Sequence, residues 1–272
     1  MSYIITSGKT SEGIVCENDS LTVLEGGVAN NTTVNEGGRM IVDGSGVATG
    51  VTVSAGGIMT VSNGGTATDI FLYDDSIFNL DLASATYVRG TADRNGNKSF
   101  EAKDGELSDF WFRGGIVNVA SGGVLSKIKM TGGYWNYELD NIDEYNGTIN
   151  ISNGATANSI TFDMGGQMFV ASGGEANTVR FYMGGAMTVQ GIASDIEIND
   201  SCELSISSGG TVSKLSVNGM DSFLYVKAGG TVNSATIGMQ ANAYIDEGSV
   251  AKDVFVQDGS LYIKNGGKLT AG

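Results

Sequence analysis

One stretch of this chain decides the fold. Residues Leu21–Gly38 read LTVLEGGVANNTTVNEGG, and a related unit begins at Met40, 19 residues after Leu21. The pattern returns in Met59–Ala67, which reads MTVSNGGTA, and further copies begin at Val117, Ile149, Met168, Met187, Leu204, Leu224, Ala243 and Leu261. A repeat of about 19 residues is typical of a solenoid, in which each unit packs on the next and most residues serve the scaffold.

Each unit contains two alternating apolar stretches, and each stretch is followed by a glycine pair. In one copy, Met168-Phe169-Val170 precedes Gly173-Gly174, and Val179-Arg180-Phe181 precedes Gly184-Gly185. Alternation with period two indicates β-strands, and glycine pairs suit sharp turns. We predict an all-β fold, a single-stranded and right-handed parallel β-helix of about 15 coils, roughly 70 Å long at about 4.8 Å per coil.

Three columns of residues are expected to point into this β-helix. The first contains Val23, Val42, Val61, Val119, Ile151, Val170, Val189, Ile206, Val226, Ile245 and Ile263. The second contains Val34, Val53, Met130, Phe162, Phe181, Ile198, Val217, Ile237 and Val256. A column of small residues contains Ala29, Ala48, Ala67, Ala157, Ala176, Ala193 and Ala251. Their constant spacing predicts that the register holds along the whole chain.

The array is expected to form one solenoid domain over residues 1–272. Its predicted parts are a cap-like coil at 1–20, regular repeats at 21–82, irregular loops at 83–113 and 135–148, and regular repeats at 149–272 with no cap at the end. The first residues lack a signal peptide's basic start and apolar run, and no stretch is long enough to span a membrane. The chain ends within a repeat, as a module of a longer protein would.

Composition narrows the chemistry. The net charge of −15 argues against nucleic acid as a partner, because phosphates would be repelled. The chain has no histidine, which removes Ser-His and Cys-His nucleophiles and the commonest metal ligand. We therefore expect no catalysis, no cofactor and no metal, with a polysaccharide lyase or hydrolase as the enzymatic alternative. Asp74-Asp75 resembles an acid pair, but it occupies the glycine-pair slot of its unit and is interpreted as a turn.

The two irregular stretches contain both tryptophans and several tyrosines. Because they lie about two coils apart, Trp111, Trp135, Tyr137 and Tyr145 are candidates for one aromatic patch. Three interpretations stay open: a hydrophobic cover for the insertions, a carbohydrate or partner site, and a calcium site. The calcium ligands would be Asp140, Asp143 and Glu144, since carboxylates suit that cation, although their spacing matches no known loop motif.

A second candidate surface lies near the end of the chain. Tyr225, Tyr244 and Tyr262 occupy the same outward position in three units and are expected to form an aromatic ladder, with neighbours about 4.8 Å apart. Such a ladder either stabilises the stack or forms a contact surface for a partner or sugar.

The two cysteines are too far apart in the array for a disulfide. Cys16 occupies an apolar slot and is expected to be buried, whereas Cys202 follows Ser201 in a turn and is expected to be more exposed.

The alternating Val-x-x-Gly-Gly and Ala-x-x-Thr-x-Val-x-x-Gly-Gly units resemble the AIDA-type repeats of self-associating bacterial autotransporter adhesins. The similarity is greatest in Leu21–Ile77 and Ile149–Ala186. It implies a passenger domain, on the cell surface or secreted, that mediates adhesion, autoaggregation or biofilm formation. The partners implied are other copies of the chain, or glycans or proteins of host and bacterial surfaces. The alternative is a glycan-binding or polysaccharide-cleaving β-helix that uses the aromatic and acidic loops.

Overall fold

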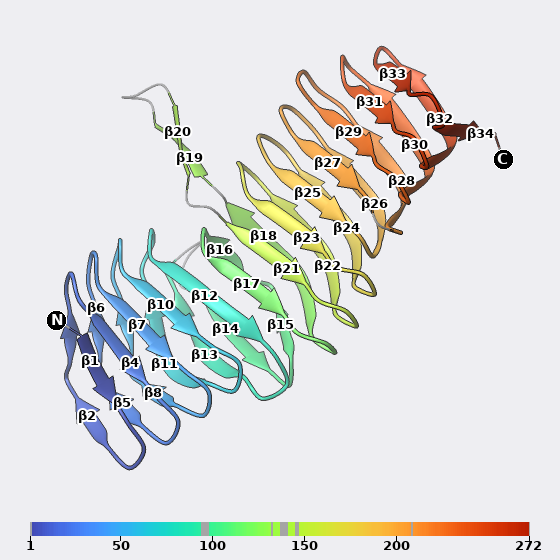
Figure 1. Cartoon of the computed structure of the whole chain (residues 1–272). Helices are drawn as coiled ribbons and strands as arrows, with labels where there is room; N and C mark the ends of the chain where they lie inside the picture. Colours follow the sequence, from blue (N-terminus) through green and yellow to red (C-terminus); the bar gives the residue numbers. More distant parts are fainter. Residues whose placement is uncertain are drawn as a thin grey trace.

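The chain winds as a parallel β-helix, and every regular element in the part that the structure describes is a β-strand (Figure 1). The computed structural model describes residues 2–93, 98–131, 133–136, 141–144, 147–207 and 209–271; for 133–136 and 141–144 it describes the backbone only. Within these residues, no helix is long and apolar enough to cross a membrane. The predicted fold class is confirmed.

One face of the solenoid is a parallel sheet, which we name sheet A. Among the described residues it has 13 strands: β1 (Ser2–Ile5), β4 (Ser20–Val23), β7 (Arg39–Val42), β10 (Ile58–Val61), β12 (Ile77–Leu82), β17 (Ile116–Val119), β21 (Thr148–Ile151), β23 (Gln167–Val170), β25 (Ala186–Val189), β27 (Glu203–Ile206), β29 (Phe223–Val226), β31 (Asn242–Ile245) and β33 (Ser260–Ile263). Each strand adds about 4.8 Å, so the rod is roughly 60 Å long.

The predicted count of about 15 coils was too high, because at two irregular stretches the chain between neighbouring strands of sheet A is longer than one repeat. Strand β12 pairs directly with β17, so that Asp81 lies beside Asn118, 37 residues further on. Strand β17 pairs with β21, so that Asn118 lies beside Asn150, 32 residues further on. The intervening residues form insertions without adding a strand to sheet A.

The second half of each coil forms the opposite wall. Its strands are β2 (Thr10–Glu12), β3 (Val15–Cys16), β5 (Val28–Asn30), β6 (Thr33–Val34), β8 (Val47–Thr49), β9 (Thr52–Val53), β11 (Thr66–Leu72), β13 (Tyr87–Ala92), β15 (Glu106–Ser108), β16 (Trp111–Arg113), β18 (Val124–Thr131), β22 (Thr156–Phe162), β24 (Glu175–Phe181), β26 (Ile192–Ile198), β28 (Thr211–Val217), β30 (Thr231–Gly238), β32 (Val250–Gln257) and β34 (Lys268–Thr270).

Apart from β13, this wall bends at one left-handed residue in each turn, which we name the corner residue. The corner residues are Gly13, Asn31, Gly50, Asp69, Asp109, Lys127, Ser159, Thr178, Asp195, Lys214, Ser234 and Asp253, with φ between 50° and 71°. The sequence pattern predicts an alternating strand in this half of each unit but no bend. The structure instead has two short segments that meet at an angle, and the corner residue drops out of the pairing between coils.

The two glycines of a turn serve different purposes. Gly56 has a φ of +71°, which side chains rarely adopt. Gly57 lacks that constraint, but a Cβ there would lie 2.5 Å from the carbonyl oxygen of Val34, one coil earlier. The first glycine lets the chain turn, and the second lets consecutive turns stack closely.

The predicted inward columns form the core. Nearly all of their residues are buried, and the alanine column is fully so; Val256 and Ile263, in the last coils, are exposed, contrary to the prediction. In the second column, the rings of Phe162 and Phe181 stack with centroids 4.2 Å apart and planes 2° apart. Equivalent residues of consecutive coils therefore lie directly above one another, as the constant spacing predicted.

Two antiparallel hairpins make up the insertions. Strand β14 (Lys98–Lys103) pairs antiparallel with both β13 and β15, and its Phe100 joins Phe78, Phe110 and Phe112 in a cluster inside the solenoid. Strands β19 (Gly133–Asn136) and β20 (Asn141–Glu144) form a separate two-stranded sheet. The first insertion is thus filled by phenylalanines from within, while Trp111 points outward.

Candidate functional site

Several predicted site residues lie where the structure says nothing of their side chains. Tyr137, Asp140 and Tyr145 are outside the described residues, and Trp135, Asp143 and Glu144 are described by backbone only, in the β19–β20 hairpin. The shared aromatic patch and the calcium site therefore stay predictions. Among the side chains that are described, no three Cys, Asp or Glu lie close enough together to hold a metal ion.

Trp111 stands on the outer face of β16, where neighbours that include Thr131, Lys129 and Arg113 hold its indole in place, with the Arg113 guanidinium carbon 5.3 Å from the ring centroid. The indole N–H donates to Thr131 Oγ1 at 2.9 Å. The ammonium of Lys129, which is paired with Trp111 across β16 and β18, lies 4.4 Å from the ring centroid. A cation in this position is attracted to the negative face of the ring, so each side chain fixes the other.

Beside Trp111 lies a hollow of about 190 Å³, which we name the corner pocket. Its lining residues are Ala92, Lys98, Asp109, Phe110, Trp111, Lys127 and Lys129. Asp109 and Lys127 are corner residues of consecutive coils, and Lys98 begins the β14 hairpin strand. The hairpin thus places Lys98 beside Lys127 and Lys129, at a part of the wall where each coil otherwise contributes one corner side chain.

The charges of the corner pocket are loosely paired. Asp109 Oδ1 lies 3.8 Å from Lys98 Nζ, and Asp109 Oδ2 lies 3.8 Å from Lys127 Nζ. Both distances exceed hydrogen-bond length. Lys129 makes a much closer ion pair with Asp163, at 2.5 Å. The pocket therefore offers two half-exposed ammonium groups that share one carboxylate.

The acidic residues Asp74 and Asp75 form a turn, as the sequence indicates. Asp75 has a left-handed φ of 61°, in the place of the first glycine of a pair. Both carboxylates bind the guanidinium of Arg113, with Nε 3.1 Å from Asp74 Oδ1 and Nη1 against Asp75 Oδ1. Their partner is a cation on the neighbouring coil, which gives the pair a structural role.

The three tyrosines form the ladder that the sequence predicts. Ring centroids are 5.3 Å apart for Tyr225 and Tyr244 and 5.0 Å apart for Tyr244 and Tyr262, with planes within 13°. Phe223 extends the stack at 6.0 Å from Tyr225. The inner ring faces are thus covered by neighbouring rings, and burial together with the Glu203 charge raises the pKa of Tyr225. This geometry favours stabilisation of the stack over a flat platform for sugars.

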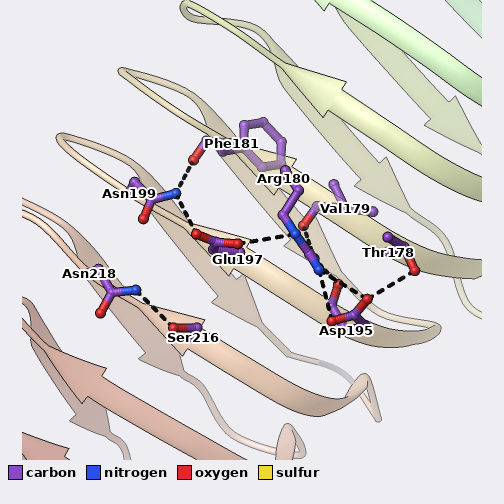
Figure 2. Close-up of polar contacts among 9 residues, drawn as sticks. All are labelled: Thr178, Val179, Arg180, Phe181, Asp195, Glu197, Asn199, Ser216 and Asn218. Carbon is purple, nitrogen blue, oxygen red and sulfur yellow. Dashed lines mark hydrogen bonds and ion pairs between the residues drawn. The ribbon is translucent and has the colours of Figure 1, made fainter.

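A network of ion pairs joins two consecutive coils, those of β24 and β26, in the second half of the rod (Figure 2). Arg180 on β24 binds Asp195 and Glu197 on β26, and Thr178 donates to Asp195 Oδ2 at 3.0 Å. The hydrogen bond from the Arg180 guanidinium lowers the pKa of the Asp195 carboxyl. Burial acts in the opposite direction, but its effect is smaller. The network lies on regular coils and its contacts run between β24 and β26, so its role is to hold these coils together.

Both cysteines are buried free thiols. The expectation of a more exposed Cys202 is wrong, because its side chain faces inward and receives the Gly185 N–H at 3.4 Å. Burial raises the pKa of Cys202, and burial together with the Asp19 charge raises the pKa of Cys16 to about 11. High pKa and burial make both thiols poor nucleophiles.

The lysines of the corner pocket are the functional candidates that sequence reasoning missed. Lys98 lies in an irregular stretch and Lys127 occupies an ordinary outward slot of a repeat. Their proximity depends on the β13–β14 hairpin, which the repeat pattern does not encode. The signal available in the sequence was the pair Lys127 and Lys129, two residues apart in a chain of net charge −15.

Comparison with known proteins agrees with this geometry. Residues 2–57 match the AIDA family model, described as an adhesin of the bacterial autotransporter system and a probable stalk. The resemblance to AIDA-type repeats is thereby confirmed. A comparison with curated protein sequences finds no match to this chain.

Two solved structures are similar to this chain to different degrees. The TibC-catalysed hyper-glycosylated fragment of TibA has 22% identity and a TM-score of 0.56, covering 99% of this chain and 94% of the fragment. The surface protein and adhesin PfbA of Streptococcus pneumoniae has 8% identity and a TM-score of 0.32, covering 100% of this chain and 91% of PfbA. The first likeness supports the fold, and the second is too weak to carry an argument.

Proposed function

Because the chain carries AIDA-type adhesin repeats, we propose that it is a non-catalytic stalk-like module, on a bacterial surface or secreted, that mediates adhesion, autoaggregation or biofilm formation. The observation that carries the proposal is the match of residues 2–57 to an adhesin stalk family. Successive coils pair in order along sheet A, so the fold of the matched segment continues along the rod. The partners we propose are further copies of the chain, or glycans or proteins of host and bacterial surfaces.

The outer face of sheet A suits self-association. Its outward side chains include short polar groups that hydrogen-bond along the rod, such as Asn79 to Thr60 at 3.0 Å and Asn150 to Asn118 at 2.8 Å. Such a ladder presents a regular row of donors and acceptors to a second rod. Each contact between rods would be weak, but a contact repeated in every coil adds up along the length.

Charge sets the conditions under which rods approach each other. Two copies of net charge −15 repel at long range, and salt shortens that range to about 10 Å at 0.1 M. We therefore expect self-association to strengthen as ionic strength rises from low values toward physiological ones. An association driven by opposite charges would show the reverse dependence.

Two measurements test the proposal. Analytical ultracentrifugation of the purified chain across salt concentrations should show reversible association, and display on a non-aggregating bacterium should make the cells settle. A chain that stays monomeric at every salt concentration, and whose display causes neither clumping nor attachment to surfaces, would rule the proposal out.

A further inference from the structure

The corner pocket reverses the charge of the rod locally. The whole chain has 15 Lys and Arg against 30 Asp and Glu. Three of those lysines, Lys98, Lys127 and Lys129, line this one pocket, together with a single carboxylate, Asp109. Even when Asp163 is counted against Lys129, a positive charge remains in excess. An acidic rod that gathers cations at one hollow has a place suited to an anion.

The donors of the pocket are available to a ligand. The Lys98 and Lys127 ammonium groups each carry three N–H donors, and Asp109 lies beyond hydrogen-bond distance of both. More than half of each lysine side chain is exposed to solvent, 53% for Lys98 and 69% for Lys127. A ligand carboxylate between them would gain charge-assisted hydrogen bonds that the resting ion pairs do not make.

The other wall of the pocket is apolar and rigid. Trp111, Phe110 and Ala92 line it, and Phe110 is 5% exposed and packed in the phenylalanine cluster. Trp111 is fixed by Thr131 and by the cationic groups of Lys129 and Arg113, which lie 4.4 Å and 5.3 Å from the ring centroid. A bare inorganic anion would leave this wall unused, whereas a ring with an apolar face and a carboxylate would contact both walls.

Size limits what enters. The hollow of about 190 Å³ is smaller than the roughly 300–1,000 Å³ of pockets for drug-sized ligands. A hollow of this size suits one substituted ring. We propose that the corner pocket binds a carboxylated sugar unit of an acidic glycan, with the carboxylate between Lys98 and Lys127 and the ring against Trp111. This inference rests on the proposed adhesive function, for which it names the chemistry of the target surface.

The test measures binding directly on purified protein. A Trp135→Phe variant leaves Trp111 as the sole tryptophan, so that its fluorescence reports on the pocket. Oligogalacturonate and sialyllactose are titrated in parallel, since uronates and sialic acids share the carboxylated ring but come from different sources. The methyl ester of oligogalacturonate and lactose are the matched neutral sugars, and acetate tests a simple anion. We expect a saturable signal with at least one acidic sugar. The neutral counterpart should bind at least about fivefold more weakly than that acidic sugar.

Matched variants locate the site. Lys127→Gln should weaken binding about fivefold or more. Lys214→Gln is the control, because Lys214 is an exposed corner residue with nearly the same φ, 55° against 52°, on a regular coil away from the pocket. Equal binding of neutral and acidic sugars, equal loss in both variants, or acetate binding as tight as the sugars would overturn the proposal. Cell aggregation that persists in Lys127→Gln would leave the adhesive function intact while the glycan site is judged by titration alone.

Discussion

The guanidinium of Arg180 contacts both carboxylate oxygens of Asp195, which lies on the next coil. Its Nη2 lies 2.9 Å from Oδ1 and 3.0 Å from Oδ2, while Nη1 donates to the Asp195 backbone carbonyl at 2.5 Å (Figure 2). Asp195 is a corner residue, so this guanidinium fixes the bend of the wall as well as the spacing of two coils. Hydrogen bonds between two ionised groups are roughly twice as strong as those between neutral groups.

The first prediction follows from the depressed pKa of Asp195. Asp195→Asn should lower the free energy of unfolding by about 0.5–1 kcal/mol at pH 7, because the pair is partly exposed and solvent screens it. A carboxyl whose folded pKa is lowered contributes stability above its unfolded pKa of about 3.9, and that contribution is lost as pH falls through the lower folded value. Urea unfolding of the two proteins should therefore converge below about pH 4.

Asp221→Asn is the control for that comparison. Asp221 is an exposed turn residue with a left-handed φ of 55°, and Asn tolerates that conformation at both positions. Its variant should differ little from the parent across the same pH range. A stability difference for Asp195→Asn that stays constant down to pH 3 would contradict the role given to the ion pair.

The second prediction concerns the fit between a core ring and a turn. A Cβ at Gly185 would overlap Cδ1 of Phe181, although the backbone there is not left-handed. Gly185→Ala should therefore cost about 1–3 kcal/mol through overpacking alone. Gly44→Ala should be nearly neutral, because the nearest atom to a Cβ there is 3.4 Å away and φ is ordinary. Phe181→Leu replaces the ring with a smaller side chain, so the double mutant with Gly185→Ala should lose less stability than the sum of the two single mutants. If the two losses simply add, the clash is not direct.

How far the sequence predicts the fold depends on what the repeat encodes. Inward residues such as Val170 and Phe181 recur at fixed spacing because every coil must bury the same positions, so the columns and the solenoid follow from the pattern. The corner residue leaves no such signal, since Asn31, Lys127 and Thr178 share a backbone conformation but no side-chain chemistry. The predicted number of coils was too high because every part of the chain was assumed to follow the repeat, although part of it forms hairpins.

The candidate site was predicted only in part. Trp111 stands out by residue type, and its outward position follows from the alternation of β16. The lysines around it come together through an antiparallel pairing between β13 and β14, a contact that no periodicity predicts. Sites at interruptions of a repeat are accordingly harder to predict than the repeat, because their geometry depends on tertiary packing.

The third prediction tests the strain at the corner. Lys214 holds φ at +55°, a conformation that costs most L residues about 1–2 kcal/mol but that Asn adopts more readily. Lys214→Asn should raise stability by about 0.5 kcal/mol, measured as a higher urea midpoint with an unchanged slope. Asn31 already occupies the equivalent corner in an early coil. A lower midpoint would show that the lysine contributes contacts that outweigh the strain.

The fourth prediction concerns the buried thiols. In the native protein at pH 8 neither Cys16 nor Cys202 should react with a thiol reagent, and both should react in denaturant. A raised folded pKa means that stability is fully present below the unfolded pKa and is lost as pH rises. Cys16 should thus destabilise the protein between about pH 9 and about pH 11. Cys16→Ala should flatten this alkaline loss, and one rapidly reacting thiol at pH 8 would contradict the burial.

The fifth prediction separates stacking from recognition in the tyrosine ladder. Tyr244 lies between two parallel rings, so Tyr244→Ala removes both stacking contacts, whereas Tyr244→Phe keeps the ring and deletes only the hydroxyl. The alanine variant should lose about 1–2 kcal/mol, since each aromatic pair contributes about 0.5–1.5 kcal/mol beyond buried area. Hydrogen exchange should place the loss in β29, β31 and β33, because coils contact only their neighbours. The phenylalanine variant should match the parent in stability and in cell aggregation. If Phe abolished aggregation while leaving exchange unchanged, the hydroxyls would be contacts for a partner, and the ladder would be a binding surface instead of a structural one.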